Sequence, residues 1–352
     1  MNTRIAFLGD IAVFDHGLLQ KDWKKILYDV HAYLAGYDVV VANLETPITD
    51  NTNTRVIKGI HLRTDKRIVE VLKYLHITHV NLGNNHIYDF GEKGVADTVD
   101  VLRENGIHYF GIGTMPSYLD LDRNISFHSF CCYSANGGGY GKVGGEIPLT
   151  EEAINKALTE DSNNDRLSVL CLHWGDEYSC YPNARQVDLF HRIAKQYRVF
   201  IHGSHTHVIQ GIEEVRNSMC IYSAGNFLMD RCISAKDKSI QISQIEDNKF
   251  SFIVSLMISD KSINDYTTVG TYYDGIRFDL VDNSERIKRL SNEIHNCHNK
   301  EYILKSRNMA NKMKRQNLGK RDIKWLLQKM NYNSLFAKIF SYINRWKYMR
   351  AY

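Results

Sequence analysis

The sequence contains no apolar run long enough to span a membrane, and none of signal-peptide length near Met1. Its seven cysteines are an odd number without regular spacing, so they do not form the pattern of a disulfide framework. Internal repeats and low-complexity segments are also missing. These absences exclude membrane-spanning, disulfide-rich and repeat classes. We expect a soluble globular protein in a reducing compartment, on the cytoplasmic side.

The 352 residues are enough for one large domain or two small ones. The overall net charge of +4 hides an asymmetry. Residues 284–352 carry 17 basic and 4 acidic side chains, which leaves 27 basic and 36 acidic side chains for residues 1–283. We therefore predict an acidic domain over 1–283 and a basic extension over 284–352. The partner of the extension would be an anionic surface, either a membrane or a nucleic acid.

Strand-like and helix-like segments alternate through residue 205, which is typical of an α/β protein. The apolar spacing predicts helices over residues 22–34, 66–75, 91–105, 150–158 and 184–196. Short apolar runs predict strands over residues 4–8, 38–43, 79–82, 109–112, 127–133, 167–172, 198–202 and 218–222, and late antiparallel strands over 249–258 and 275–281. Residues 136–145 contain six glycines, which predicts a loop near the site.

Polar side chains gather where the predicted strands end. The segment 81–91, NLGNNHIYDFG, begins at the end of a predicted strand. After Gly83 it carries two amides, a histidine and an aspartate, which cannot build a core. In open α/β sheets, ligands bind at the edge where the carboxyl ends of the strands lie. Four other strand ends carry further polar groups, at Gly9-Asp10, Asn43-Leu44-Glu45, His173-Trp174-Gly175 and residues 203–207.

A mixed oxygen and nitrogen ligand set results, made of Asp10, Glu45, Asn85, His173, His205 and His207. Carboxylates and imidazoles in this proportion favour Mn, Fe or Zn over Ca. Glu45 has two oxygens and could bridge two ions, while His205 and His207 could each bind a different ion. Such a two-metal centre lowers the pKa of a bound water and stabilises both oxygens of an in-line displacement.

Each residue also has an ordinary structural interpretation. An aspartate such as Asp10 caps helices more often than it binds metal, and a single histidine such as His173 is often a satisfied, half-buried side chain. Asn85 and Asp89 belong to types that favour turns. The His-x-His pair and the joint occurrence of all six residues at strand ends favour the metal site.

The motifs around these residues resemble those of the CapA (poly-γ-glutamate capsule synthesis) family, a branch of the calcineurin-like metallophosphoesterase superfamily. The resemblance covers about residues 4–230, and its motifs are FLGD (7–10), ANLETPIT (42–49), NNHIYDFG (84–91), HWGDEY (173–178), GSHTHVIQGIE (203–213) and YSAGNFL (222–228). It implies a four-layer α/β/β/α sandwich with metals between the loops at the sheet ends, followed here by a C-terminal helical extension.

The resemblance also implies roles for residues. The superfamily positions that bind metal correspond here to Asp10, Glu45, Asn85, His173, His205 and His207. His86 would act as an acid or a phosphate contact, and Asp89 would orient it through a ring nitrogen.

The chain departs from the superfamily pattern in several places. Ala12 stands where phosphatases usually have histidine, and Glu45 replaces an aspartate. Fewer ligands are therefore expected for the first ion, namely Asp10, Glu45 and His207. His16 could substitute, or it is an ordinary surface turn residue. In the last histidine motif, Ser204 and Thr206 stand where the family more often has His and Pro.

Three more charged residues are candidates for holding substrate. Arg63 and Arg185 could bind an anionic substrate, with an ordinary surface arginine as the alternative for each. Glu177, four residues after His173, could support a ligand or pair with a base.

The basic extension has helical spacing over residues 322–330 and 334–347, with the apolar side chains on one face. Such helices could make peripheral contact with an anionic membrane. Alternatively they pack on the body or on a second subunit with their charges solvated. No recognition motif accompanies the charge, so no nucleic-acid partner is expected.

Two functional hypotheses follow. The first is a metal-dependent, phosphoesterase-like hydrolase of the CapA type, acting in capsule, poly-γ-glutamate or surface polysaccharide synthesis. Two divalent ions would activate water to attack a phosphoester, or an amide of an anionic polymer, and His86 would assist the leaving group. The second is a non-catalytic assembly factor of a capsule synthesis complex, in which the same pocket binds metal or polymer.

Overall fold

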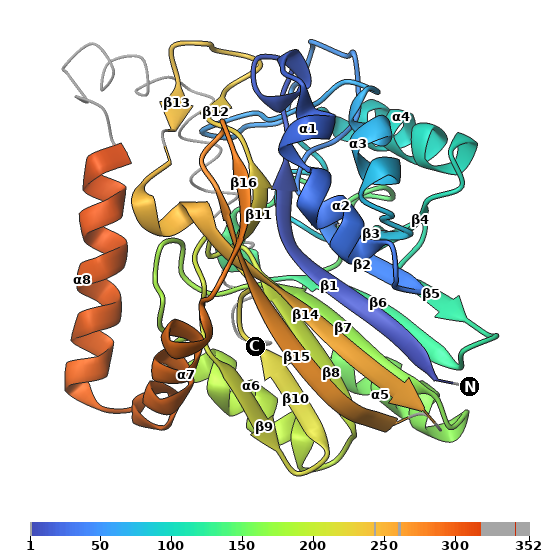
Figure 1. The fold of residues 1–352 in the computed structure, drawn as a ribbon, viewed down its shortest axis with the longest axis vertical. Coiled ribbons are helices and arrows are strands. Elements are labelled where there is room, and N and C mark those ends of the chain that lie inside the picture. The colour runs from blue at the N-terminus through green and yellow to red at the C-terminus, as the bar shows by residue number, and fades with distance from the viewer. Residues whose placement is uncertain (1, 243, 260–261, 318–341, 343–352) are drawn as a thin grey trace.

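The computed structural model describes residues 2–242, 244–259, 262–317 and 342. These residues form two large β-sheets that share a layer of apolar side chains and carry helices on their outer faces (Figure 1). A separate small ribbon pairs β12 (Cys232–Ile233) with β13 (Gln241–Ile242).

The first sheet has eight strands in the described part of the chain. Its order is β16 (Phe278–Val281), β15 (Ser262–Tyr273), β14 (Phe250–Ser259), β1 (Thr3–Ala12), β2 (Val39–Leu44), β3 (His79–Asn81) and β4 (His108–Phe110), and β11 (Asn226–Met229) pairs with β1. β1 to β4 run parallel, so their carboxyl ends meet at one edge. The strand VVVANL of β2 is buried at every position, as expected for a parallel strand covered on both faces.

The second sheet repeats this plan with six strands in the described residues. Its order is β5 (Ser117–Asp120), β6 (Ile125–Cys131), β7 (Leu167–His173), β8 (Val199–Ser204), β10 (Ser218–Ile221) and β9 (Ile212–Val215). β6, β7, β8 and β10 are parallel, and antiparallel strands close both edges.

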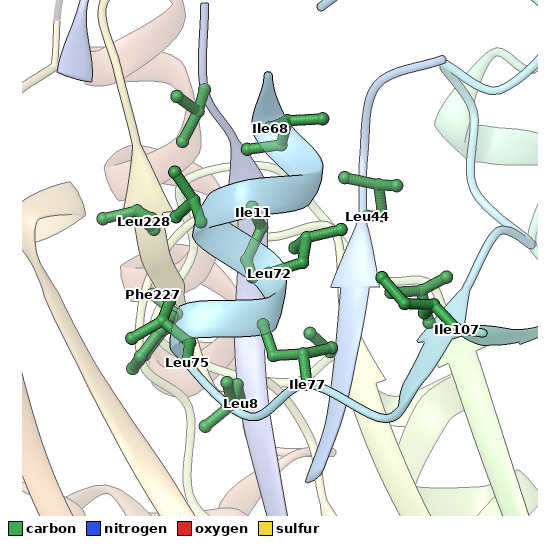
Figure 2. Close-up of a cluster of buried hydrophobic side chains, with 14 of the residues drawn as sticks. Leu8, Ile11, Leu44, Ile68, Leu72, Leu75, Ile77, Ile107, Phe227 and Leu228 are labelled. Atoms are coloured by element: carbon green, nitrogen blue, oxygen red, sulfur yellow. The ribbon is translucent and has the colours of Figure 1, made fainter. Parts of the chain in front are cut away.

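Successive side chains of the central strands point to opposite faces of the sheet. One set packs in the core between the two sheets, and the other packs in an outer core beneath the helices. Phe7 of β1 points into the layer between the sheets, where its ring centroid lies 4.7 Å from that of Phe200 in β8. Leu8 points the other way, toward the helices that cover the first sheet, α1 (Trp23–Ile26), α2 (Tyr28–Leu34), α3 (Ile68–Tyr74) and α4 (Gly91–Glu104). Figure 2 shows part of this outer core, where α3 lies over the strands with Leu8, Ile11, Leu44, Ile68, Leu72 and Leu75 drawn.

The second sheet is covered by α5 (Glu151–Asn163) and α6 (Ala184–Ala194). Ile154 of α5 and Phe190 of α6 are fully buried in a third core with Leu170 and Ile201 from the strands. The predicted four-layer α/β/β/α order is therefore confirmed.

The structure corrects three predicted elements. The helix expected over 22–34 is two helices, α1 and α2, which meet at Leu27 (φ −99°, ψ 10°). β1 continues past Leu8 to Ala12, so Asp10 lies within the strand. β15 was not predicted, because its alternating polar and half-buried residues lack a clear apolar run.

The beginning of the basic extension packs on the body. α7 (Ser284–Glu293) places Ile287 and Leu290 against the layer between the sheets. α8 (Lys300–Asn317) buries Tyr302 in the core below α6. The helices predicted over 322–330 and 334–347 lie outside the described residues. Among the helices that are described, none has both the length and the apolar character needed to cross a membrane.

Candidate metal centre

All six predicted ligands lie at the joined carboxyl edge of the two sheets. Asp10 lies in β1, Glu45 directly follows β2, and Asn85 lies in the turn after β3. The second sheet contributes His173 at the end of β7, and His205 and His207 after β8. The structure thus brings together side chains that are up to 197 positions apart in the sequence.

A first triad consists of Asp10, Glu45 and His207, whose ligand atoms all lie within 4.8 Å of one another. His207 Nδ1 is 3.7 Å from Asp10 Oδ2, and His207 Nε2 is 3.8 Å from Glu45 Oε1. Asp10 is held by Asn43 Nδ2, which donates to Oδ1 at 2.8 Å, and by the His205 main-chain N–H, which donates to Oδ2 at 3.3 Å.

A bulge in β1 directs Asp10 to this position. The pairing register of β1 shifts between Phe7 and Asp10 toward β2, and between Asp10 and Ile11 toward β11. Gly9 permits the bulge, because a Cβ there would lie 2.1 Å from Gly225 O. Bulges commonly redirect a side chain in this way.

The second triad consists of Glu45, His173 and His205, again with ligand atoms within 4.8 Å of one another. His173 Nε2 lies 3.7 Å from Glu45 Oε1 and 3.1 Å from His205 Nδ1. Asn85 joins this triad, since its Oδ1 is 3.0 Å from His173 Nε2 while its Nδ2 donates to Ala135 O at 2.8 Å.

Hydrogen bonds made by the outer atoms of His173 and Asn85 turn the lone pairs of these two side chains toward the second triad. His173 Nδ1 is 2.9 Å from Ser204 Oγ, and donation to this hydroxyl leaves the lone pair on Nε2. Asn85 Oδ1 can only accept. In this tautomer, Nε2, Oδ1 and Glu45 Oε1 are three electron-pair donors that face one another, which is unfavourable unless a cation lies between them.

Glu45 is the clearest sign of a cation. The residue is 1% exposed, and neither carboxylate oxygen has a hydrogen-bond partner among the described residues. Burial raises the pKa of Glu45 to about 8. A buried carboxylate without hydrogen bonds is costly unless it is neutralised or coordinates a metal. Because Glu45 belongs to both triads, the donors present fit a divalent ion in each.

The remaining charges of the site are strongly coupled. Burial alone would lower the pKa of His207, but Glu45, Asp10 and Glu177 together raise it above its ordinary value. Burial raises the pKa of Asp10, and His207 only partly opposes this.

The two histidines after β8 have unusual backbones, with φ at 93° for His205 and 60° for His207. A positive φ is uncommon for residues other than glycine, and unusual backbone conformations gather at functional sites. The turn at 205–207 places the two imidazoles in different triads.

His86 and Asp89 form a pair beside the second triad, with His86 Nδ1 2.7 Å from Asp89 Oδ2. Lys58 completes the cluster and was not predicted. Its ammonium donates to Asn85 O at 2.6 Å and to Asp89 Oδ1 at 2.8 Å, and it lies 3.1 Å from His86 Nδ1. Burial and Lys58 lower the pKa of His86. Burial would raise the pKa of Asp89, but Lys58 and His86 outweigh it and keep this pKa below its ordinary value.

Buried amides support the ligands from behind and were also missed. Asn43 Oδ1 accepts from Asn81 Nδ2 at 3.1 Å and from Asn84 Nδ2 at 3.3 Å. Asn84 Oδ1 in turn accepts from the main-chain N–H groups of His86 and Ile87, both at 3.1 Å. These bonds fix the turn that carries Asn85 and His86.

Neither Ala12 nor His16 contributes a ligand atom to the first triad. Ala12 is fully buried among apolar side chains, including Phe14 and Met229. His16 is exposed, and its Nε2 contacts Arg231 O at 2.9 Å.

The predicted substrate residues lie at different places. Glu177 is half-buried and close enough to affect the pKa of both Glu45 and His207. Arg63 donates to Thr49 O at 2.7 Å, and among the described contacts it makes none with the six ligands. Arg185 is exposed at the start of α6 and lines a groove beside the centre. The glycine-rich segment 136–145 is irregular, and Gly138 packs against Val56, two residues from Lys58.

The family model named bacterial capsule synthesis protein PGA_cap matches residues 4–231. The chain belongs to this family. The resemblance predicted from the motifs is thereby confirmed. The PGA_cap match contains both triads and Asn85, and it ends before α7 and α8.

Two relatives show the same likeness. The chain is 30% identical over 241 residues to the PGA biosynthesis protein CapA of Bacillus subtilis (strain 168), which covers 64% of this chain and 63% of that protein. It is 30% identical over 238 residues to the capsule biosynthesis protein CapA of Bacillus anthracis, which covers 62% of this chain and 57% of that protein. The chain therefore spans less than two thirds of the length of either relative.

A solved structure gives a weaker likeness. The 5'-nucleotidase from Candida albicans SC5314 aligns with a TM-score of 0.42 at 9% identity, over 89% of this chain and 58% of that chain. A likeness at this level says nothing about activity.

Proposed function

We propose that this chain is a metal-dependent hydrolase of the phosphoesterase type that acts in capsule or poly-γ-glutamate synthesis. The observation that carries the proposal is Glu45, a buried carboxylate that finds no hydrogen-bond partner in the described part of the chain and belongs to two triads of ligand atoms. The names of the relatives, which refer to PGA and capsule biosynthesis, support the pathway.

The donors suit two divalent ions such as Mn, Fe or Zn. Asp10, Glu45 and His207 would hold one ion, and Glu45, His173, His205 and Asn85 would hold the other. When bound, the ions would supply Lewis-acid polarisation and a lowered pKa for water.

In this proposal His86 would transfer a proton to the leaving group. Its Nδ1 lies between Asp89 Oδ2 and Lys58 Nζ. The ring proton lies on Nδ1 when that atom donates to Asp89, and on Nε2 when Lys58 donates to Nδ1. The second form can donate from Nε2 to a departing oxygen while Lys58 holds the ring through Nδ1, and Asp89 orients the ring in the first form only.

The substrate would be an anionic polymer or a phosphoester derived from it. The pathway names fit a polymer that carries many negative charges, and the bond at the centre would be a phosphoester or an amide of that polymer.

The test is metal reconstitution followed by turnover. Protein stripped by chelation and reloaded with Mn should contain about two ions per chain and hydrolyse p-nitrophenyl phosphoesters. Asp10→Ala should lose metal and activity together. His86→Ala should keep the metal but lose about a hundredfold or more in kcat. His16→Ala, an exposed histidine outside the centre, is the matched control and should retain both.

A second candidate function is a non-catalytic assembly factor of a capsule synthesis complex that binds metal or polymer. The observation in its favour is Ala12, which is buried among apolar side chains at the position where phosphatases usually have a histidine. The first triad therefore lacks that ligand. A fully metal-loaded protein that is inert on every phosphoester offered would contradict the hydrolase and support this role.

A further inference from the structure

A groove of about 550 Å³ lies beside the metal centre, between α6 and α8. Its inner wall includes Cys132 and Ser134. The main-chain N–H of Cys132 donates to His173 O at 2.8 Å, and Ala135 O accepts from Asn85 Nδ2 at 2.8 Å. The same short segment therefore lines the groove and contacts two residues of the second triad.

α8 forms the outer wall and is held in a fixed position. The Tyr302 hydroxyl donates to Pro182 O at 2.8 Å, and Ser306 Oγ lies 2.8 Å from Ser179 Oγ in a buried contact. This packing presents Ile303, Arg307 and Asn311 to the groove, four residues apart along one face of the helix.

Two arginines give the groove its charge. Arg185 of α6 and Arg307 of α8 both line it, both are exposed, and neither makes an ion pair or hydrogen bond with the described residues. The acid among the lining residues is Asp176, whose Oδ2 accepts from Asn183 Nδ2 at 3.1 Å. The groove is thus positive by one charge, although residues 1–283 carry nine more acidic than basic side chains.

We propose that this groove is a subsite that extends the metal centre and binds carboxylates of a linear polyanion. The proposal rests on the proposed function, since its occupant is the anionic polymer whose bond lies at the two triads. Guanidinium groups match carboxylates with paired N–H donors. Two arginines on two walls suit a chain with repeated charges, because a single small anion would neutralise one of them. Arg307 lies on α8, outside the residues that the family model matches.

Binding of a labelled γ-linked glutamate decamer to the Mn-loaded protein, followed by fluorescence anisotropy at low salt, tests the subsite. Arg185→Gln and Arg307→Gln should each raise Kd about threefold, and the double variant about tenfold, as expected for exposed charge pairs. The controls keep the helix and the type of change but lie outside the groove. They are Arg192→Gln on α6, which pairs with Glu151, and Lys305→Gln on α8, which pairs with Glu301. Both should bind within twofold of the parent.

Wild-type affinity in the double variant would overturn the subsite. A polyphosphate of equal charge that binds more tightly and depends more on the two arginines would overturn the assignment to a carboxylate chain. The measurements also distinguish failure of the proposed hydrolase activity from failure of the subsite. A protein inert on phosphoesters that still shows arginine-dependent binding keeps the subsite, and phosphoester hydrolysis without arginine-dependent binding keeps only the hydrolase.

Discussion

At the residue scale, Lys58 shows how a charge can be kept inside the protein. Its side chain is 8% exposed and forms an ion pair at 2.8 Å with Asp89, which is fully buried. The same ammonium holds the main chain of Asn85. Lys58 therefore neutralises the buried Asp89 and also holds Asn85, a proposed metal ligand, in position.

Replacing Lys58 with methionine should destabilise the fold by about 3–5 kcal/mol, because it leaves the Asp89 carboxylate buried without its counter-ion. Urea unfolding measures the change. Lys93→Met is the matched control. Lys93 pairs with Asp97 at the surface, with 69% of its side chain exposed, and its loss should cost less than about 1 kcal/mol. Partial recovery in the Lys58→Met/Asp89→Asn double variant would confirm the cause, and equal costs for the two lysines would contradict it.

Two buried histidines make stability depend on pH. Burial lowers the pKa of His202 to about 4, and burial together with His108 lowers that of His79 to about 3. Between pH 6.5 and 4 the unfolded chain binds protons at these positions and the folded chain does not. The free energy of unfolding should therefore fall with decreasing pH, by about 1.4 kcal/mol per pH unit for each histidine.

His202→Leu tests this dependence, since His202 lies between the sheets with its ring 5.3 Å from that of Phe7. Over the same pH range the variant should lose about 1.4 kcal/mol per pH unit of the slope, measured by urea unfolding. Superimposable pH profiles for variant and parent would show that His202 carries no such cost.

At the scale of the element, the bulge in β1 should be decisive for the metal centre. Gly9→Ala would place a Cβ 2.1 Å from Gly225 O, a backbone atom that cannot move easily. We expect a loss of about 1–3 kcal/mol in stability and weaker metal binding, because Asp10 shifts with the strand. Thermal unfolding and a metal titration check both effects. Gly59→Ala is the control, since a Cβ at Gly59 meets nothing within 4 Å, and it should bind metal normally.

Local patterns predicted most central elements because those elements are buried along their length. β2 is one aliphatic run, and α6 has a clear apolar face. β15 was missed because its pairing with β14 is a tertiary contact that leaves no apolar run. The bulge in β1 was missed for a related reason, since it depends on Gly225, more than two hundred residues away.

The same distinction applies to the candidate site. The clustering of the six proposed ligands could be predicted because each stands beside a recognisable strand end. Lys58 lies in an irregular stretch without periodicity, and its partners Asn85 and Asp89 are 27 and 31 residues away. No nearby residue marks it, so only the folded chain reveals its position.

At the scale of the whole molecule, the first part of the extension, α7 and α8, packs on the body. A truncation after Asn283 removes several buried side chains, of which the large apolar ones are Ile287, Leu290, Ile294 and Tyr302. It should destabilise the protein by about 6 kcal/mol or more, at about 1.5–3 kcal/mol for each side chain. A truncation after Asn317 keeps them and is the control, and it should melt at a clearly higher temperature than the shorter chain. Equal melting temperatures for both truncations would contradict the contribution of these side chains.

The proposed ligands come equally from the two sheets. Asp10, Glu45 and Asn85 lie in or after strands of the first, and His173, His205 and His207 lie in or after strands of the second. Ions held at this seam would have to leave before the two halves of the sandwich could part. The rate at which the protein releases its ions to a strong chelator would then report how often that seam opens.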